Sequence, residues 1–208
     1  MIDLAFLVTA FAALFVVIDP IGLTPIFVAL TRGMTATRRR ALAVRACVIS
    51  FAILLVFALF GEAVLGFIGI SMPAFRVAGG ILLFLTALDM LFERRQKRRR
   101  DQADEDEEDD DDPSVFPLAI PLIAGPGAIA TIILLVGRGE GLVGFAAIMG
   151  VLLAVLALVL IMFLGAGLLE RLLGKVGINV VTRLLGMLLA ALSVQFVLDG
   201  LRSFGLGG

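Results

Sequence analysis

The chain has 208 residues, 61% of them hydrophobic, and its 17 basic and 18 acidic side chains give a net charge of −1. Soluble domains contain roughly 45 to 50% apolar residues, so this composition excludes an ordinary soluble protein and predicts one that resides in a bilayer. The absence of His excludes histidine metal ligands and proton relays, and the single Cys excludes a disulfide framework within the chain.

Six apolar stretches are long enough to cross a bilayer, which takes about 20 residues of helix. They cover residues 4–30, 42–61, 74–92, 115–136, 142–168 and 180–201. We therefore expect an all-α membrane protein with six transmembrane helices. The first stretch lacks a basic leader and a small-residue cleavage site, so it is expected to stay in the protein.

The first span contains two X-Pro steps near its middle, Asp19-Pro20 and Thr24-Pro25. Proline removes a backbone donor and clashes with the preceding turn, so we expect the helix to break or kink here. Asp19 could bind a substrate ammonium or a cation, or titrate during proton coupling after desolvation. Alternatively, it only caps the half-helix that starts at Pro20.

Between the third and fourth spans the composition changes abruptly. Six basic residues lie between Arg94 and Arg100, and ten acidic residues follow between Asp101 and Asp112. Such a segment cannot bury enough apolar surface to order itself, so residues 93–114 are predicted to form a disordered cytoplasmic linker. A regulatory or lipid-headgroup-binding role is the alternative.

The fourth span is interrupted in its turn, by Pro117, Pro121 and Gly125-Pro126-Gly127. Glycines at 125 and 127 would let a ligand approach the backbone amides of the next half-helix, which suit an anionic group. Freed backbone groups cannot face lipid, so the breaks in spans one and four are expected to line one cavity at mid-membrane depth.

Three sequence motifs recur in the same order in the two halves. Residues Glu62 to Ile70 match Glu170 to Ile178 at five of nine positions. Upstream, Pro20 to Pro25 resembles Pro121 to Pro126, and downstream Arg76 to Gly79 resembles Arg183 to Gly186. With three spans each, residues 1–92 and 115–208 are predicted to be inverted repeats, an arrangement typical of transporters.

The basic residues lie mostly on one side of the predicted topology. Fourteen of the 17 fall at the first, third and fifth connections, which the positive-inside tendency assigns to the cytoplasm. Both termini are therefore expected outside the cytoplasm. The repeated motif that begins at Glu62 is expected in an outer loop and its twin at Glu170 in an inner one.

Polar residues in the third and sixth spans complete the candidate site. Gln195 is a plausible cavity contact, whereas Asp199 is expected to pair with Arg202, three residues on. Arg76 and Arg183 either anchor helix ends or reach inward to a carboxylate. The glycines at 79, 80 and 186 are expected to pack helices closely, although some could lie between protomers of a homo-oligomer.

The chain resembles the MarC family of bacterial inner-membrane proteins. The resemblance rests on Asp19 to Pro25, Gly69 to Gly80, Pro121 to Thr131, Thr182 to Gly186 and Val194 to Phe196. It implies a six-span protein similar to the LysE superfamily of small-solute exporters, placed in the bacterial inner membrane. Many relatives carry Asn at the position of Asp19.

We expect a secondary transporter of a small polar or zwitterionic solute, such as an amino acid. Its substrate-binding residues are predicted to be Asp19, Pro20, Gly22, Thr24, Pro25, Gly125, Pro126, Gly127, Thr131 and Gln195. A cation or metal exporter and a non-transporting membrane scaffold are the alternatives. No cofactor, bound metal, catalysis or nucleic-acid partner is expected; the partners are the lipid bilayer and the transported solute or ion.

Overall fold

The computed structural model describes residues 3–94, 112–139 and 141–205, and every regular element within these ranges is helical. The prediction of an all-α chain is thereby confirmed. The elements, in chain order, are α1 (Leu4–Ile18), α2 (Pro20–Leu30), α3 (Ala36–Ile68), α4 (Met72–Leu91), the irregular helix η2 (Ser114–Ile123), α6 (Pro126–Val136), α7 (Gly141–Leu164) and α8 (Ala166–Ser203).

Five of the described segments are long and apolar enough to cross a membrane. They are α1 with α2 as one segment (Leu4–Leu30), α3, α4, α7 and the part of α8 from Val176 to Ser203. A sixth is added if η2 and α6, which meet at an angle of 57°, are counted as one bent span. The expected number of spans is thus reached only by joining this bent pair. Residues 95–111, most of the predicted linker, lie outside the described residues.

Two predicted boundaries were wrong. Helix α3 begins at Ala36 because the Thr35 hydroxyl accepts a hydrogen bond from the Arg38 backbone N–H at 3.3 Å, so it starts before the apolar stretch. It continues to Ile68 and ends at Gly69 with φ 84°, so most of the outer loop expected from Glu62 is helical.

The fifth span ends earlier than predicted. Helix α7 stops at Leu164 and α8 starts at Ala166, because Gly165 leaves the helical conformation. Composition alone missed this turn, since the residues around it are apolar. Helix α8 then kinks at Gly174, where φ is 60°, within the second copy of the repeated motif.

Helices α4 and α8 pack against each other in antiparallel directions through glycines. A Cβ on Gly80 would lie 2.8 Å from the Ser193 carbonyl oxygen, and one on Gly186 would lie 2.9 Å from the Met90 Cβ. At the other end, a Cβ on Gly200 would lie 3.0 Å from the carbonyl oxygen of Pro73. The predicted close packing at Gly80 and Gly186 therefore occurs within one protomer.

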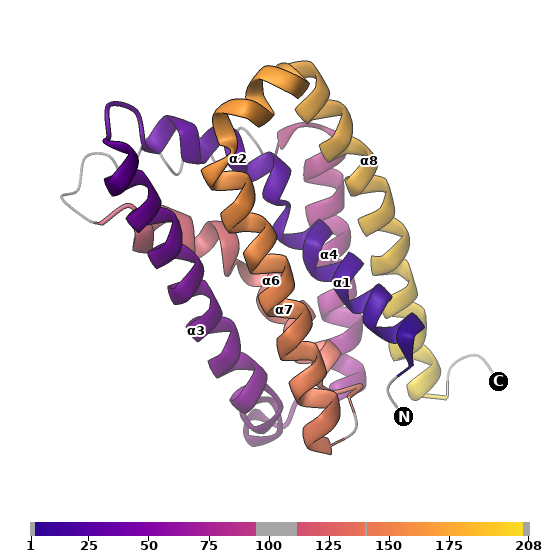
Figure 1. Ribbon diagram of the computed structural model, residues 1–208. Coiled ribbons are helices and arrows are strands. Elements are labelled where there is room, and N and C mark those ends of the chain that lie inside the picture. The colour runs from indigo at the N-terminus through magenta and orange to yellow at the C-terminus, as the bar shows by residue number, and fades with distance from the viewer. Residues whose placement is uncertain (1–2, 95–111, 140, 206–208) are drawn as a thin grey trace.

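The remaining helices pack against one another and reach this pair mainly through α1, α2 and α6. Helix α3 packs on η2, α6 and α7; α1 packs on α6, α7 and α8; α2 packs on α7 and α8; and α4 packs on α6. The start of α1 and the end of α8 lie at the same end of the bundle (Figure 1). Large apolar side chains such as Phe60, Leu153 and Leu188 remain exposed on the outside, as expected for a surface that contacts lipid.

Candidate functional site

Asp19 is the junction between α1 and α2. It adopts a left-handed backbone conformation (φ 58°, ψ 64°), and its N–H donates to the Phe15 carbonyl oxygen at 2.9 Å, which closes α1. Its Oδ1 accepts from the Gly22 backbone N–H at 3.0 Å, which caps α2. One residue thus ends one helix and starts the next, and the expected capping role is what the geometry shows.

The residues after Asp19 fit this turn closely. Pro20 occupies the first position of α2, where a missing N–H has no consequence. A Cβ on Gly22 would lie only 2.1 Å from Asp19 Oδ2, so only glycine leaves room for the capping carboxylate. Thr24 is fully buried and donates its hydroxyl to the Pro20 carbonyl oxygen at 2.9 Å. Pro25, inside α2, leaves the Ile21 carbonyl without its usual helical donor.

The junction between η2 and α6 has a different construction. Gly125 is the first boundary residue of α6, with an ordinary extended backbone (φ −81°, ψ 171°), and no side chain caps the helix. Pro126 takes the first helical position, as Pro20 does in α2. A Cβ on Gly125 would lie 2.4 Å from the Pro121 carbonyl oxygen, which explains the glycine. The first amides of α6 therefore meet no carboxylate of their own segment.

The two junctions lie beside each other. The Cβ position of Gly127 in α6 is 3.1 Å from Cγ1 of Val17, two residues before Asp19. The same position is 3.5 Å from Leu83 Cδ2 and 3.9 Å from Thr86 Oγ1, both in α4. Thr131 is fully buried and donates its hydroxyl to the Gly127 carbonyl oxygen at 2.8 Å. Nine of the ten predicted site residues thus belong to two neighbouring helix starts.

The electrostatics at this place are set by Asp19, whose exposed fraction is 1%. Burial at this depth removes water from the carboxylate, and the amino end of α2 partly compensates through the Gly22 N–H and the helix dipole. The bare amino end of α6 adds a second positive pole without a carboxylate. The two helix starts therefore differ in charge: a buried carboxylate lies at the start of α2, and no side chain caps the start of α6.

The tenth residue, Gln195, belongs to another cluster. It is exposed, and its amide nitrogen donates to Asp199 Oδ1 at 2.7 Å. Asp199 forms an ion pair with Arg138, which follows α6, and Arg138 also lies over the Phe196 ring, 5.2 Å from its centroid. The expected Asp199 partner was Arg202. Sequence reasoning missed Arg138 because no local pattern links positions 61 residues apart.

A second ion pair joins α8 to the end of α4. Arg183 Nη2 lies 2.6 Å from Glu93 Oε1, and the Asn179 side-chain amide donates to the same oxygen at 3.3 Å. The two side chains are about half exposed. Arg183 thus pairs with a carboxylate at a helix end, and the role in which it reaches inward is not what this ion pair shows.

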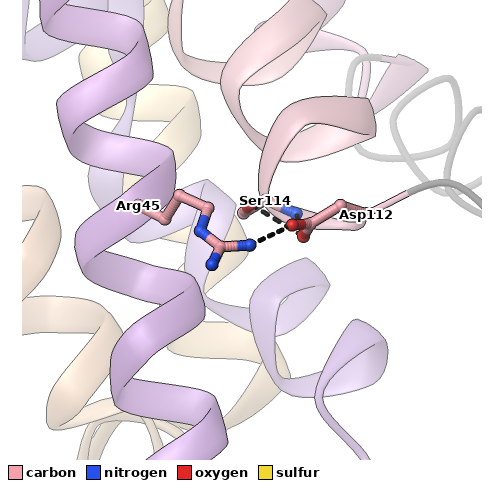
Figure 2. Close-up of polar contacts among 3 residues, drawn as sticks. All are labelled: Arg45, Asp112 and Ser114. Atoms are coloured by element: carbon pink, nitrogen blue, oxygen red, sulfur yellow. Dashed lines mark hydrogen bonds and ion pairs between the residues drawn. The ribbon is translucent and has the colours of Figure 1, made fainter.

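Asp112 connects the start of η2 to α3 (Figure 2). Its Oδ1 accepts from the Ser114 backbone N–H at 3.0 Å and from the Ser114 hydroxyl at 2.7 Å, and its Oδ2 pairs with Arg45. The two Ser114 hydrogen bonds, followed by Arg45, hold the pKa of the Asp112 carboxyl below its ordinary value. The end of the predicted linker is therefore tied to the first half of the chain.

Comparison with known proteins gives one consistent result. A family model described as "MarC family integral membrane protein" matches residues 4–204. The UPF0056 membrane protein YvbG of Bacillus subtilis is 40% identical over 200 residues, 95% of either chain. A UPF0056 membrane protein of Methanocaldococcus jannaschii is 35% identical over 201 residues, 96% of this chain and 98% of its own. The UPF0056 inner membrane protein YhgN of Escherichia coli is 34% identical over 196 residues, 94% of this chain and 96% of its own. No solved structure matches.

Proposed function

Since this chain belongs to the MarC family of integral membrane proteins, we propose that it is a secondary transporter of a small polar or zwitterionic solute, such as an amino acid. The observation that carries the proposal is the meeting of two Pro-initiated helix starts inside the apolar core. A Cβ on Gly127, in α6, would lie 3.1 Å from Val17, two residues before Asp19 in the last turn of α1. Asp19, Thr24 and Thr131 are each buried. Interrupted helices that meet in the membrane interior are typical of transporter binding sites.

Inverted repeats are supported by details of α2 and α6. Both helices have 11 residues and begin with proline, Pro20 and Pro126, which are 106 positions apart. Thr24 donates its hydroxyl to Pro20 and Thr131 donates its hydroxyl to Gly127. The two donors are 107 positions apart in the sequence, the two acceptors are also 107 apart, and so are Arg76 and Arg183. The helix starts pair Pro20 with Pro126, whereas the offset of 107 pairs Pro20 with Gly127. Both differ from Pro121, the counterpart that sequence similarity suggested. The position of a residue at the start of a helix is therefore a better guide to which residues correspond in the two repeats than the spacing of prolines in the sequence.

The contacts between helices also support two related halves of the chain. If residues 1–92 and 115–208 are equivalent, α1 corresponds to η2, α2 to α6, α3 to α7 and α4 to α8. The contact of α3 with η2 then corresponds to α7 with α1, and that of α2 with α8 to α6 with α4. The antiparallel contact of α4 with α8 is its own counterpart. The additional contacts of α1 with α6 and α8 depart from this symmetry. In the proposed mechanism, this asymmetry marks the structure as one of the two conformations between which the transporter alternates.

In the proposed mechanism the two repeats rock about the paired helix starts. Asp19 holds the ammonium of a zwitterionic solute, and the uncapped amides at the start of α6 hold its carboxylate. Rocking would open the site to one side of the membrane and then to the other. Asp19 would also be the coupling residue, because a desolvated carboxylate can exchange a proton or a cation between the two states.

The proposed placement is multi-pass in the bacterial inner membrane, the location in the name of the Escherichia coli relative. The basic residues assign the connection between α2 and α3 and the linker at 93–114 to the cytoplasm. Both termini would then lie outside, in agreement with the shared end of the bundle at which α1 starts and α8 finishes.

Transport by the purified full chain in liposomes tests this proposal. Radiolabelled amino acids should accumulate under a proton or sodium gradient and should not accumulate in protein-free liposomes. Asp19→Asn is the matched variant, since Asn keeps the helix cap but removes the charge. We expect Asp19→Asn to abolish the dependence on the ion gradient. Absence of movement of any amino acid under every gradient would reject the amino-acid proposal, and gradient-dependent movement of a divalent cation instead would favour a cation exporter.

A further inference from the structure

Arg39, in the first turn of α3, presents an unpaired edge of its guanidinium. Its Nε and Nη2 are both buried, and neither has a hydrogen-bond partner among the described residues. These two nitrogens carry parallel N–H groups on one side of the planar group, the geometry that receives the two oxygens of a carboxylate or phosphate. Burial without an acceptor is unfavourable for charged N–H donors, so this edge lacks a partner that its chemistry requires.

Aromatic packing holds the guanidinium in place. Its central carbon lies 5.1 Å from the centroid of the Phe27 ring, in α2. Phe27 is fully buried and stacks on Phe163 of α7, with centroids 4.3 Å apart and planes inclined by 1°. The Arg39 side chain is therefore fixed over an aromatic pair by a cation–π contact, which orients its donors before any ligand arrives.

Three other arginines in the described ranges show what Arg39 lacks. Arg45 pairs with Asp112, Arg138 with Asp199 and Arg183 with Glu93. Within the described ranges, no carboxylate approaches Arg39 in the same way. We propose that the Nε–Nη2 edge of Arg39 is a binding site for an oxyanion, either a carboxylate or a phosphate, held side-on above Phe27. This site is separate from the helix starts at Asp19 and Gly125, and the inference does not depend on transport.

Two sources can supply this chemistry. Arg39 lies where α3 begins and where α2 and α7 end, so an anionic lipid headgroup and a small dissolved anion can both reach this end of the bundle. A dissolved anion would add a second anion-binding position near the proposed transport path. A lipid phosphate would instead anchor the ends of α2, α3 and α7 to the bilayer surface.

Thermal unfolding of the full chain in a neutral detergent, with total ionic strength held constant by sodium chloride, tests the site. Cys47 is free and buried, so a thiol-reactive fluorescent dye reports unfolding. The probes are sodium phosphate, sodium acetate and a short-chain phosphatidylglycerol. We expect a saturable rise in unfolding temperature with at least one probe. Saturation by acetate or phosphate identifies a dissolved anion, and saturation by phosphatidylglycerol alone identifies a lipid.

The decisive variant is Arg39→Lys, which keeps the positive charge but loses the planar pair of donors. It should raise the half-saturating concentration about tenfold or more. Arg38→Gln, which removes an exposed neighbouring charge, is the matched control and should leave that concentration nearly unchanged. The proposal is overturned if the wild-type chain responds to none of the three probes, or if Arg39→Lys responds like wild type.

A second variant keeps the test open if Arg39→Lys does not purify as a folded protein. Phe27→Leu retains the guanidinium but removes the ring that orients it. We expect a several-fold rise in the half-saturating concentration, with saturation still reached. An unchanged response in Phe27→Leu would contradict the proposed geometry.

Discussion

The starts of α2 and α6 both leave backbone N–H groups without helical partners, and the two starts differ in the residues that stand there. Helix α2 starts at an aspartate in a left-handed conformation whose carboxylate caps the Gly22 amide, and α6 starts at a glycine in an extended conformation without a side-chain cap. Both continue with proline. The comparison teaches that a helix can begin among buried residues either with a side-chain carboxylate as its cap or with no side-chain cap at all.

The largest effect is expected at Asp19. Asp19→Ala removes the cap, worth about 0.5 to 2 kcal/mol, and also the local hydrogen bonding that lets Asp occupy the left-handed region, where other residues with a Cβ are disfavoured by about 1 to 2 kcal/mol. We expect a total loss of about 2 to 4 kcal/mol, measured by SDS-driven unfolding followed by circular dichroism. Asp19→Asn, which caps and tolerates this conformation, should lose less than about 1 kcal/mol. Equal losses in the two variants would show that the turn does not depend on the cap.

The next largest effect is a difference in stability loss between substitutions of Gly125 and of Gly127 at the start of α6. Gly125→Ala forces a Cβ to within 2.4 Å of a backbone oxygen, whereas the nearest atom at Gly127 is a Val17 methyl at 3.1 Å. Overpacking of this kind costs about 1 to 3 kcal/mol at Gly125, and we expect less than about 1 kcal/mol for Gly127→Ala. The same unfolding measurement compares them, and a larger loss at Gly127 would contradict the observed arrangement of the bend.

A smaller effect tests whether the two helix starts are equivalent. Thr24→Val and Thr131→Val each remove one buried hydroxyl bond to a carbonyl oxygen four residues earlier. Each should cost about 1 kcal/mol, and the two values should agree to within about 0.5 kcal/mol if the environments are related by the repeat. Unfolding curves of the single and double variants provide the comparison, since additive losses are expected for two separate bonds. Clearly unequal losses would weaken the assignment of inverted repeats.

The smallest effect concerns Asp112, which lies outside the helix core. Because its pKa is lowered in the folded chain, its contribution is fully present above the unfolded pKa of about 4 and is lost as pH falls through the folded pKa. The side chain is exposed, so the change should stay below about 1 kcal/mol. Unfolding temperatures at pH 5 and pH 3 should differ less in Asp112→Asn than in wild type. Arg45→Gln should retain more of the difference, because Ser114 is the main cause of the shift; the reverse order would assign the shift to Arg45.

Sequence patterns predicted the helical class and the family, and they identified Pro20 and Pro126, which the structure places at the first positions of α2 and α6. Pro20 and Pro126 were informative because proline has one chemical consequence for a helix wherever it occurs. Patterns were less informative where the structure depends on contacts between distant segments. The pairing of Asp199 with Arg138 and the turn at Gly165 are examples, since neither is marked by local composition. The predicted contact of Gln195 with the cavity stays a prediction, because its amide bonds to Asp199.

The sequence by itself determined that the chain is helical and apolar enough for a bilayer, and that Asp19 and Gly125 each precede a proline, which the structure places at the start of a helix. These properties follow from side-chain hydrophobicity and proline geometry, which act locally. Only the tertiary structure decided that the start of α6 lies against the end of α1 and that glycines bring α4 and α8 into close contact. It also decided that Arg39 lies over Phe27 with its Nε and Nη2 lacking an acceptor among the described residues. Those features depend on the packing of segments far apart in the chain, where a difference of a few ångströms decides which groups meet.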